Sequence, residues 1–123
     1  MDETILPPGH TDCLQISEIL GRIGDKWTVL IIMALHGRPH RFNEIKRAIN
    51  GISQQMLTRT LKNLERDGMV SRTVHPTVPP QVEYALTELG RSLSVPVAAM
   101  GSWAWANLDD IKEKRALYDA AHG

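Results

Sequence analysis

Apolar residues in the first third of the chain recur three or four positions apart, the spacing of an amphipathic helix. A short first helix is predicted after the N-cap candidates Thr11 and Asp12. Its apolar positions are Leu14, Ile16, Ile19 and Leu20. The segment 26–35 is apolar nearly all round, which predicts a central buried helix that ends at Gly37 and Pro39. Its inner face is expected to hold Trp27, Leu30, Ile31 and Ala34.

Two more amphipathic helices follow, separated by a tight break at Asn50 and Gly51. The helix over 41–49 turns Phe42, Ile45 and Ile49 inward and Arg41, Lys46 and Arg47 outward. The next helix begins after Ser53, its predicted N-cap. It buries Leu57, Leu61 and Leu64, and its opposite face carries Gln55, Arg59, Lys62 and Arg66. Helix, glycine-containing turn and a helix with a cationic outer face are typical of a helix-turn-helix.

Beyond Gly68 the apolar period changes from about 3.6 residues to about 2, which predicts a β-hairpin. The two strands alternate around Val70, Arg72 and Val74 and around Val82, Tyr84 and Leu86. The loop between them is stiffened by Pro76, Pro79 and Pro80. A helix-turn-helix followed directly by a hairpin predicts a winged helix, mainly α with a small β-hairpin. No other strand pair is expected.

A last helical region is predicted from Glu88, with Thr87 as its cap and a kink or split at Pro96. Its apolar stripe is Leu89, Leu93, Val97 and Met100. Further apolar residues follow at Trp103, Trp105, Leu108 and Ile111. This much apolar surface, after a core that is already closed, is expected to be buried against a second subunit.

Composition and charge narrow the function. The 123 residues suit one domain, 42% hydrophobic and 23% charged. No apolar run is long enough for a membrane span, and the acidic, proline-broken start is not a secretory signal, so a cytoplasmic protein without membrane contact is expected. The net charge is zero, yet the segment from Arg38 to Arg72 contains eight cationic residues and only three acidic ones. Such a basic middle suits a nucleic-acid partner.

Metal and catalytic chemistry find little support. A single cysteine, Cys13, excludes an internal disulfide framework and a multi-cysteine zinc site. His36 and His40 lie four residues apart, but Gly37 and Pro39 break the helix that would align them. No glycine-rich phosphate loop or carboxylate pair occurs, so we expect no enzyme activity, no cofactor and no metal site.

Five motifs occur in order with little insertion. They are Gly24-Asp-Lys-Trp-Thr-Val-Leu-Ile, Arg41-Phe-Asn-Glu-Ile, Gly51-Ile-Ser-Gln-Gln-Met-Leu-Thr, Leu64-Glu-Arg-Asp-Gly-Met-Val and Val82-Glu-Tyr-Ala-Leu-Thr-Glu-Leu-Gly. Together they resemble the HxlR-type, MarR-like winged-helix transcription regulators, over roughly residues 13–103. The resemblance implies a bacterial homodimer that represses or activates transcription at an inverted-repeat operator.

The resemblance also implies dimer contacts from the first and last helices. We therefore expect a flexible arm at 1–10 and one domain at 11–123, whose helices at about 88–121 dimerise. The predicted interface residues are Leu14, Leu93, Val97, Met100, Trp103, Trp105 and Leu108.

Contacts with DNA are expected from the second helix of the helix-turn-helix, whose N-terminal end enters the major groove in this motif. The predicted residues there are Ser53, Gln54, Gln55, Thr58, Arg59 and Lys62. Arg41 and Arg72 are assigned to flanking phosphates, and His75 and Thr77 to the tip of the wing. The tip holds no arginine, so insertion into the minor groove is the weaker expectation. The alternative is a winged helix that binds only protein, which predicts a mixed or acidic outer face.

Several members of the family sense oxidants or electrophiles through a cysteine that matches Cys13. In the first turn of a helix the dipole favours the thiolate, although Asp12 opposes it. Without a second cysteine, oxidation gives an intersubunit Cys13–Cys13 bond, a mixed disulfide or a sulfenic acid. The alternative is a small apolar residue packed at the subunit interface. Leu14 stands where many members have proline, so the local geometry differs from theirs.

Overall fold

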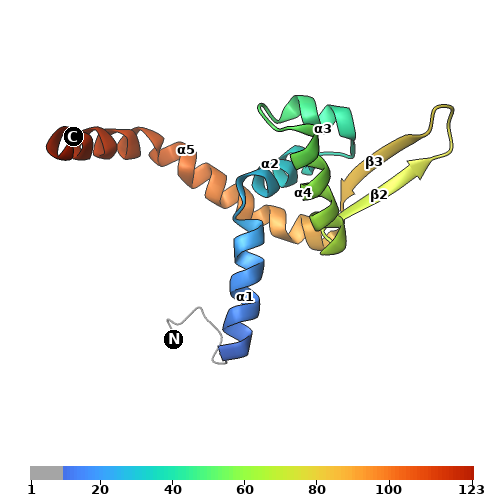
Figure 1. Ribbon diagram of the computed structural model, residues 1–123, viewed down its shortest axis with the longest axis horizontal. Coiled ribbons are helices and arrows are strands. Elements are labelled where there is room, and N and C mark those ends of the chain that lie inside the picture. The colour runs from blue at the N-terminus through green and yellow to red at the C-terminus, as the bar shows by residue number, and fades with distance from the viewer. Residues whose placement is uncertain (1–9) are drawn as a thin grey trace.

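Helices dominate the structure, a computed structural model that describes residues 10–123 (Figure 1). The arm predicted for 1–10 lies outside this range except for His10, which is part of α1. The elements are α1 His10–Ile23, α2 Lys26–Leu35, β1 His40–Arg41, α3 Phe42–Ala48, α4 Gln54–Arg66, β2 Val70–His75, β3 Gln81–Leu86 and α5 Glu88–His122. Because α1 already includes Thr11 and Asp12, the prediction that they are its N-caps is wrong.

The core lies where α2, α3, α4, the base of the hairpin and the first part of α5 meet. Leu57, Leu61 and Leu64 of α4 are buried in it, as predicted. The predicted inner face of α2 is only partly right. Its buried residues are Thr28, Ile31, Ile32 and Leu35, whereas Leu30 is exposed. A helix that is apolar nearly all round has no polar side to fix which face turns inward, so its neighbours decide.

The turn between α3 and α4 has the predicted chemistry. Gly51 has a φ of +88°, in the left-handed region that glycine adopts without a steric penalty. The Ser53 hydroxyl accepts a hydrogen bond from the Met56 backbone N–H at 3.0 Å and so caps the N-terminus of α4. The direction in which α4 leaves the turn is therefore set locally.

The sheet has three antiparallel strands in the order β1-β3-β2. The hairpin β2–β3 is confirmed, but the expectation of no other strand is wrong, because β1 pairs Arg41 with Glu83. A strand of two residues is too short to show a period of 2. Val70 and Leu86 are buried at the base of the hairpin, while Val74 is 51% exposed. The wing thus projects from the body beyond α4 (Figure 1).

The last helix is continuous. Thr87 caps it by accepting a hydrogen bond from the Gly90 N–H at 3.1 Å. Of the two outcomes predicted at Pro96, a kink or a split, the split is wrong, since α5 runs unbroken through that residue. Pro96 lacks an N–H for the carbonyl of Ser92, but both residues are exposed, so water can replace that hydrogen bond. One helix of 35 residues therefore connects the body to the C-terminus.

The packing of α5 corrects part of the predicted interface. Its buried residues are Gly90, Ser94 and Val97. Val97 is 2% exposed within the core of its own chain and Leu93 packs against that core, so Val97 is unavailable to a partner and Leu93 largely so. The stripe expected from Leu89 to Met100 faces solvent at both ends.

Two helices, α1 and α5, extend from the body (Figure 1), and several of their apolar side chains are exposed. On α1, Leu14, Ile19 and Leu20 are exposed, and on α5 so are Met100, Trp103, Trp105 and Leu108. Within residues 10–123, no helix combines the length and the apolar character needed to span a membrane.

Candidate nucleic-acid interface

The outer face of α4 carries the predicted polar and cationic side chains. Gln54, Gln55, Arg59, Lys62 and Arg66 are all exposed, because the leucines on the opposite face are drawn into the core. Within the part of the chain that the structure describes, neither Arg59 nor Lys62 has an ion-pair partner. Their charges are therefore available to an external anion.

A groove of about 390 Å³ runs between α4 and the wing. It brings together three predicted DNA-binding residues, Thr58 and Lys62 of α4 and Arg72 of β2. The other lining residues are Leu61, Glu65 and Tyr84, and we call this set the α4 groove. Two cations from consecutive elements, the helix α4 and the strand β2, thus face one cleft, with a hydroxyl beside them. Such donors suit a phosphate backbone that passes between helix and wing.

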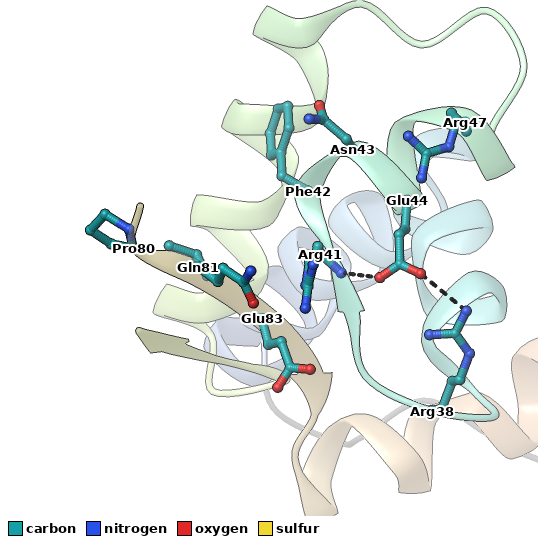
Figure 2. Close-up of a pocket in the computed structure, with 10 residues that line it drawn as sticks. Arg38, Arg41, Phe42, Asn43, Glu44, Arg47, Pro80, Gln81 and Glu83 are labelled. Atoms are coloured by element: carbon teal, nitrogen blue, oxygen red, sulfur yellow. Dashed lines mark hydrogen bonds and ion pairs between the residues drawn. The ribbon is translucent and has the colours of Figure 1, made fainter. Parts of the chain in front are cut away.

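A second and larger groove, of about 820 Å³, lies between α3 and β3 (Figure 2). We call it the arginine groove, after Arg38, Arg41 and Arg47, which line it together with Glu44 and Glu83. Arg41 was predicted to bind a phosphate, whereas Arg38 and Arg47 were not assigned to DNA. The pairing of β1 with β3 brings this part of the chain beside the wing, and that pairing has no signal in the sequence. Only the excess of cations pointed to these two residues.

Glu44 organises the mouth of the arginine groove. It accepts a hydrogen bond from the Arg41 backbone N–H at 2.9 Å and one from Arg38 Nη2 at 3.2 Å (Figure 2). The backbone hydrogen bond from Arg41, followed by the side-chain hydrogen bond from Arg38, holds the pKa of Glu44 below its ordinary value. Glu44 therefore remains ionised and offsets Arg38, while Arg41 and Arg47 have no ion-pair partner among residues 10–123.

The two residues predicted at the wing tip bond within the wing. His75 Nε2 lies 2.7 Å from Glu83 Oε1, and the Thr77 hydroxyl donates to the Pro79 carbonyl at 2.8 Å. The most prominent side chain of the tip is the fully exposed Val78. The wing therefore presents an apolar tip, and its base, at Arg72, presents the cation.

Cys13 lies apart from these grooves. It is the fourth residue of α1, is half-buried and belongs to the helix that projects away from α4 (Figure 1). Within the described range, no three histidine, cysteine or acidic residues gather closely enough to hold a metal ion. Any influence of Cys13 on α4 must therefore be transmitted along α1.

Removing the cap of α4 should have a measurable cost. We expect Ser53→Ala to lower the free energy of unfolding by about 1 kcal/mol, because the Met56 N–H loses its acceptor. Urea denaturation followed by circular dichroism measures this. The control is Ser92→Ala, which removes an exposed hydroxyl within α5 and should change stability by less than about 0.5 kcal/mol. Equal stability of the two variants would contradict a capping role.

Comparison with known proteins agrees with this geometry. The sequence model of the HxlR-like helix-turn-helix family matches residues 22–112. The chain is similar to YtfH of Escherichia coli strain K12, a helix-turn-helix transcriptional regulator, with 44% identity over 94 residues, 76% of this chain and 75% of YtfH. Among solved structures, YtfH of Salmonella typhimurium has a TM-score of 0.77 at 40% identity, covering 82% of this chain and 90% of the other. The redox regulator HypR in its reduced form has a TM-score of 0.75 at 40% identity, and the match covers 80% of this chain and 98% of HypR.

Proposed function

The chain belongs to the HxlR-like helix-turn-helix family of transcriptional regulators, which bind DNA, and on that premise we propose that it binds an inverted-repeat operator as a homodimer. The observation that carries the proposal is the outer face of α4, where cations without an ion-pair partner in the described chain adjoin a groove shared with the wing. The alternative, a module that binds only protein, requires a mixed or acidic outer face, which these residues do not form.

The N-terminal end of α4 would enter the major groove. There Ser53, Gln54 and Gln55 would meet base edges, since hydroxyl and amide groups can both donate and accept. Thr58, Arg59 and Lys62 lie one to two turns further along and would reach bases or the adjoining backbone. Arg72 and Arg41 would bind phosphates from the α4 groove and the arginine groove, with His75 and Thr77 near the sugar–phosphate surface beside the wing.

The uncovered apolar residues of α1 and α5 support a second copy of the chain as the partner. Trp103 and Trp105 are 62% and 82% exposed, and burial of side chains this large contributes strongly to association. We propose Leu14, Met100, Trp103, Trp105 and Leu108 as dimer contacts. A two-fold axis through this interface would present two α4 helices to major grooves about 34 Å apart.

Selection of duplexes from a random-sequence pool, followed by gel shift of the enriched sequence, tests the proposal. We expect an inverted repeat to be enriched and its affinity to fall steeply with salt. Light scattering should give the mass of a dimer. If no sequence is enriched, or if all duplexes bind equally, operator recognition is excluded and the protein-binding alternative gains support.

We further propose that oxidation of Cys13 controls operator binding. HypR is described as a redox regulator, and Cys13 is half-buried on α1, the helix that also carries the proposed dimer contact Leu14. In the simplest reaction, the Cys13 thiols of two subunits form one disulfide. Diamide accepts the two electrons and two protons released and becomes the hydrazine. Strain passed from α1 to the body would then move α4.

For the wild type, we expect diamide to lower operator affinity by about 5- to 150-fold, a typical coupling between two sites. A covalent dimer should appear on a non-reducing gel, and dithiothreitol should reverse both changes. Cys13→Ser is the matched control and should bind the operator equally with and without diamide. A wild type that shows neither a dimer band nor a loss of affinity would rule out redox control through this residue.

A further inference from the structure

An ion pair joins α1 directly to the recognition helix. Arg22 Nη1 donates to Asp67 Oδ2 at 2.9 Å and to Asp67 Oδ1 at 3.0 Å. Arg22 is in the last turn of α1, and Asp67 is the C-cap residue of α4. Both side chains are about seven-tenths buried, with 27% and 29% of their surface exposed. The contact is therefore shielded from solvent more than an ordinary surface pair.

The Asp67 carboxylate has no role in ending α4. Its backbone N–H already bonds to the Asn63 carbonyl at 3.0 Å, and Gly68, with a φ of +76°, makes the turn that follows. A carboxylate at the C-terminus of a helix also faces the negative end of the helix dipole, which disfavours it. Arg22 compensates this repulsion. The position of Asp67 is thus explained by the contact with α1 and not by the needs of α4 itself.

The rest of α1 is weakly held. It packs against α2 and projects from the body, with Leu14, Ile19 and Leu20 exposed (Figure 1). Arg22 gives it a second attachment, to α4, that bypasses α2. Two attachments to different helices restrict the angle of α1 far more than one does.

We propose that Arg22 is a positioning residue: its ion pair with Asp67 fixes the angle between α1 and α4 and thereby sets the spacing of the two recognition helices in the dimer. This rests on the proposed function, in which α1 contributes to the dimer interface and α4 enters DNA. The 13 residues of α4 span about 20 Å, so a small rotation about its C-terminal end displaces Ser53 and its neighbours at the other end. Without the ion pair, each α4 could change its angle independently, so the dimer would accept half-sites at more than one spacing.

Operators of altered spacing test this role. The probe is the inverted repeat enriched by the wild-type protein, with its central spacer lengthened or shortened by one base pair, which rotates one half-site by about 35°. We expect the wild type to bind these duplexes about tenfold more weakly than the enriched one. Arg22→Met keeps the aliphatic stem without the charge. Its affinity for the respaced duplexes should be less than about threefold below its affinity for the enriched duplex. The exchange Arg22→Asp with Asp67→Arg should restore the tenfold discrimination.

The controls separate positioning from stability. Lys114→Met breaks an ion pair of 3.0 Å within α5 and should discriminate between operator spacings as strongly as the wild type does. Asp67→Asn keeps the shape of the side chain and is the second test, to be used if circular dichroism shows that Arg22→Met folds poorly. We expect it to show the same weakened discrimination between operator spacings. If folded Arg22→Met or Asp67→Asn still binds the respaced duplexes about tenfold more weakly than the enriched one, the positioning role is overturned. The proposal of operator binding would not be affected by that result. Failure of the wild type to enrich any duplex overturns the proposed function, and the positioning role with it.

Discussion

Gly90→Ala is expected to lower the free energy of unfolding by about 3 kcal/mol, the largest effect of any single methyl group we predict in this chain. A Cβ at this position would overlap the backbone carbonyl oxygen of Met69 and lie 3.0 Å from its carbonyl carbon. Leu86 Cδ2 would be 3.3 Å away on another side. The first turn of α5 thus packs directly on the backbone that leads into β2.

The Met69 backbone cannot move aside cheaply. Its carbonyl accepts the Thr87 N–H at 3.0 Å, and its own N–H donates to the Leu64 carbonyl at 2.9 Å. A shift that accommodated the methyl group would break a hydrogen bond at the start of α5 or at the end of α4. The cost therefore includes backbone rearrangement as well as overpacking, which places it at the upper end of the usual range.

The matched control is Gly101→Ala in the same helix. A Cβ there would have Met33 Cε as its nearest neighbour, at 3.8 Å, which is an ordinary van der Waals contact. Alanine is also the better helix former, so this variant should be stabilised by up to about 1 kcal/mol. Urea denaturation of both variants measures the difference. A Gly90→Ala protein as stable as the wild type would show that α5 does not pack against Met69 in this way.

Sequence patterns predicted the helix-turn-helix well because its signals are local. The leucine stripe of α4 is long enough to fix the buried face, Ser53 has a short-range capping role, and Gly51 is needed for a positive φ. The hairpin followed from its alternation and its prolines. Each of these signals lies within a short stretch of the chain, so no knowledge of the packing was required.

The remaining features depend on contacts between distant segments. The inner face of α2 is chosen by its neighbours, and Val97 is drawn into the core of its own chain. Pro96 is tolerated because it faces solvent, which a sequence does not reveal. Arg22 and Asp67 are 45 residues apart, and no periodicity connects them.

The candidate site divides in the same way. Residues of the α4 groove were predicted from the face of one helix and the strand beside it, and the structure brings Thr58, Lys62 and Arg72 together. In the arginine groove only Arg41 was predicted. Arg38 and Arg47 join it through a strand pair of two residues, which is too short to leave a pattern.

Arg59→Ala should weaken operator binding by roughly 10- to 100-fold, because Arg59 occupies the middle of the exposed face of α4 and has no ion-pair partner among residues 10–123. The pattern of the loss identifies its target. A guanine contact predicts that specificity relaxes at one base pair, whereas a phosphate contact predicts an equal loss on every sequence. Gel shifts on the enriched operator and its single-base variants separate the two outcomes.

Lys62 should behave differently, because it lies in the α4 groove beside Arg72, where a phosphate backbone would run. We expect Lys62→Ala to reduce the slope of log affinity against log salt by about 1, since one fewer counterion is released on binding. Titrations at several salt concentrations measure this, with Lys112→Ala, on the exposed side of α5, as the control that keeps the wild-type slope. If Arg59→Ala and Lys62→Ala both bound the operator as the wild type does at physiological salt, the interface would have to lie elsewhere than on α4.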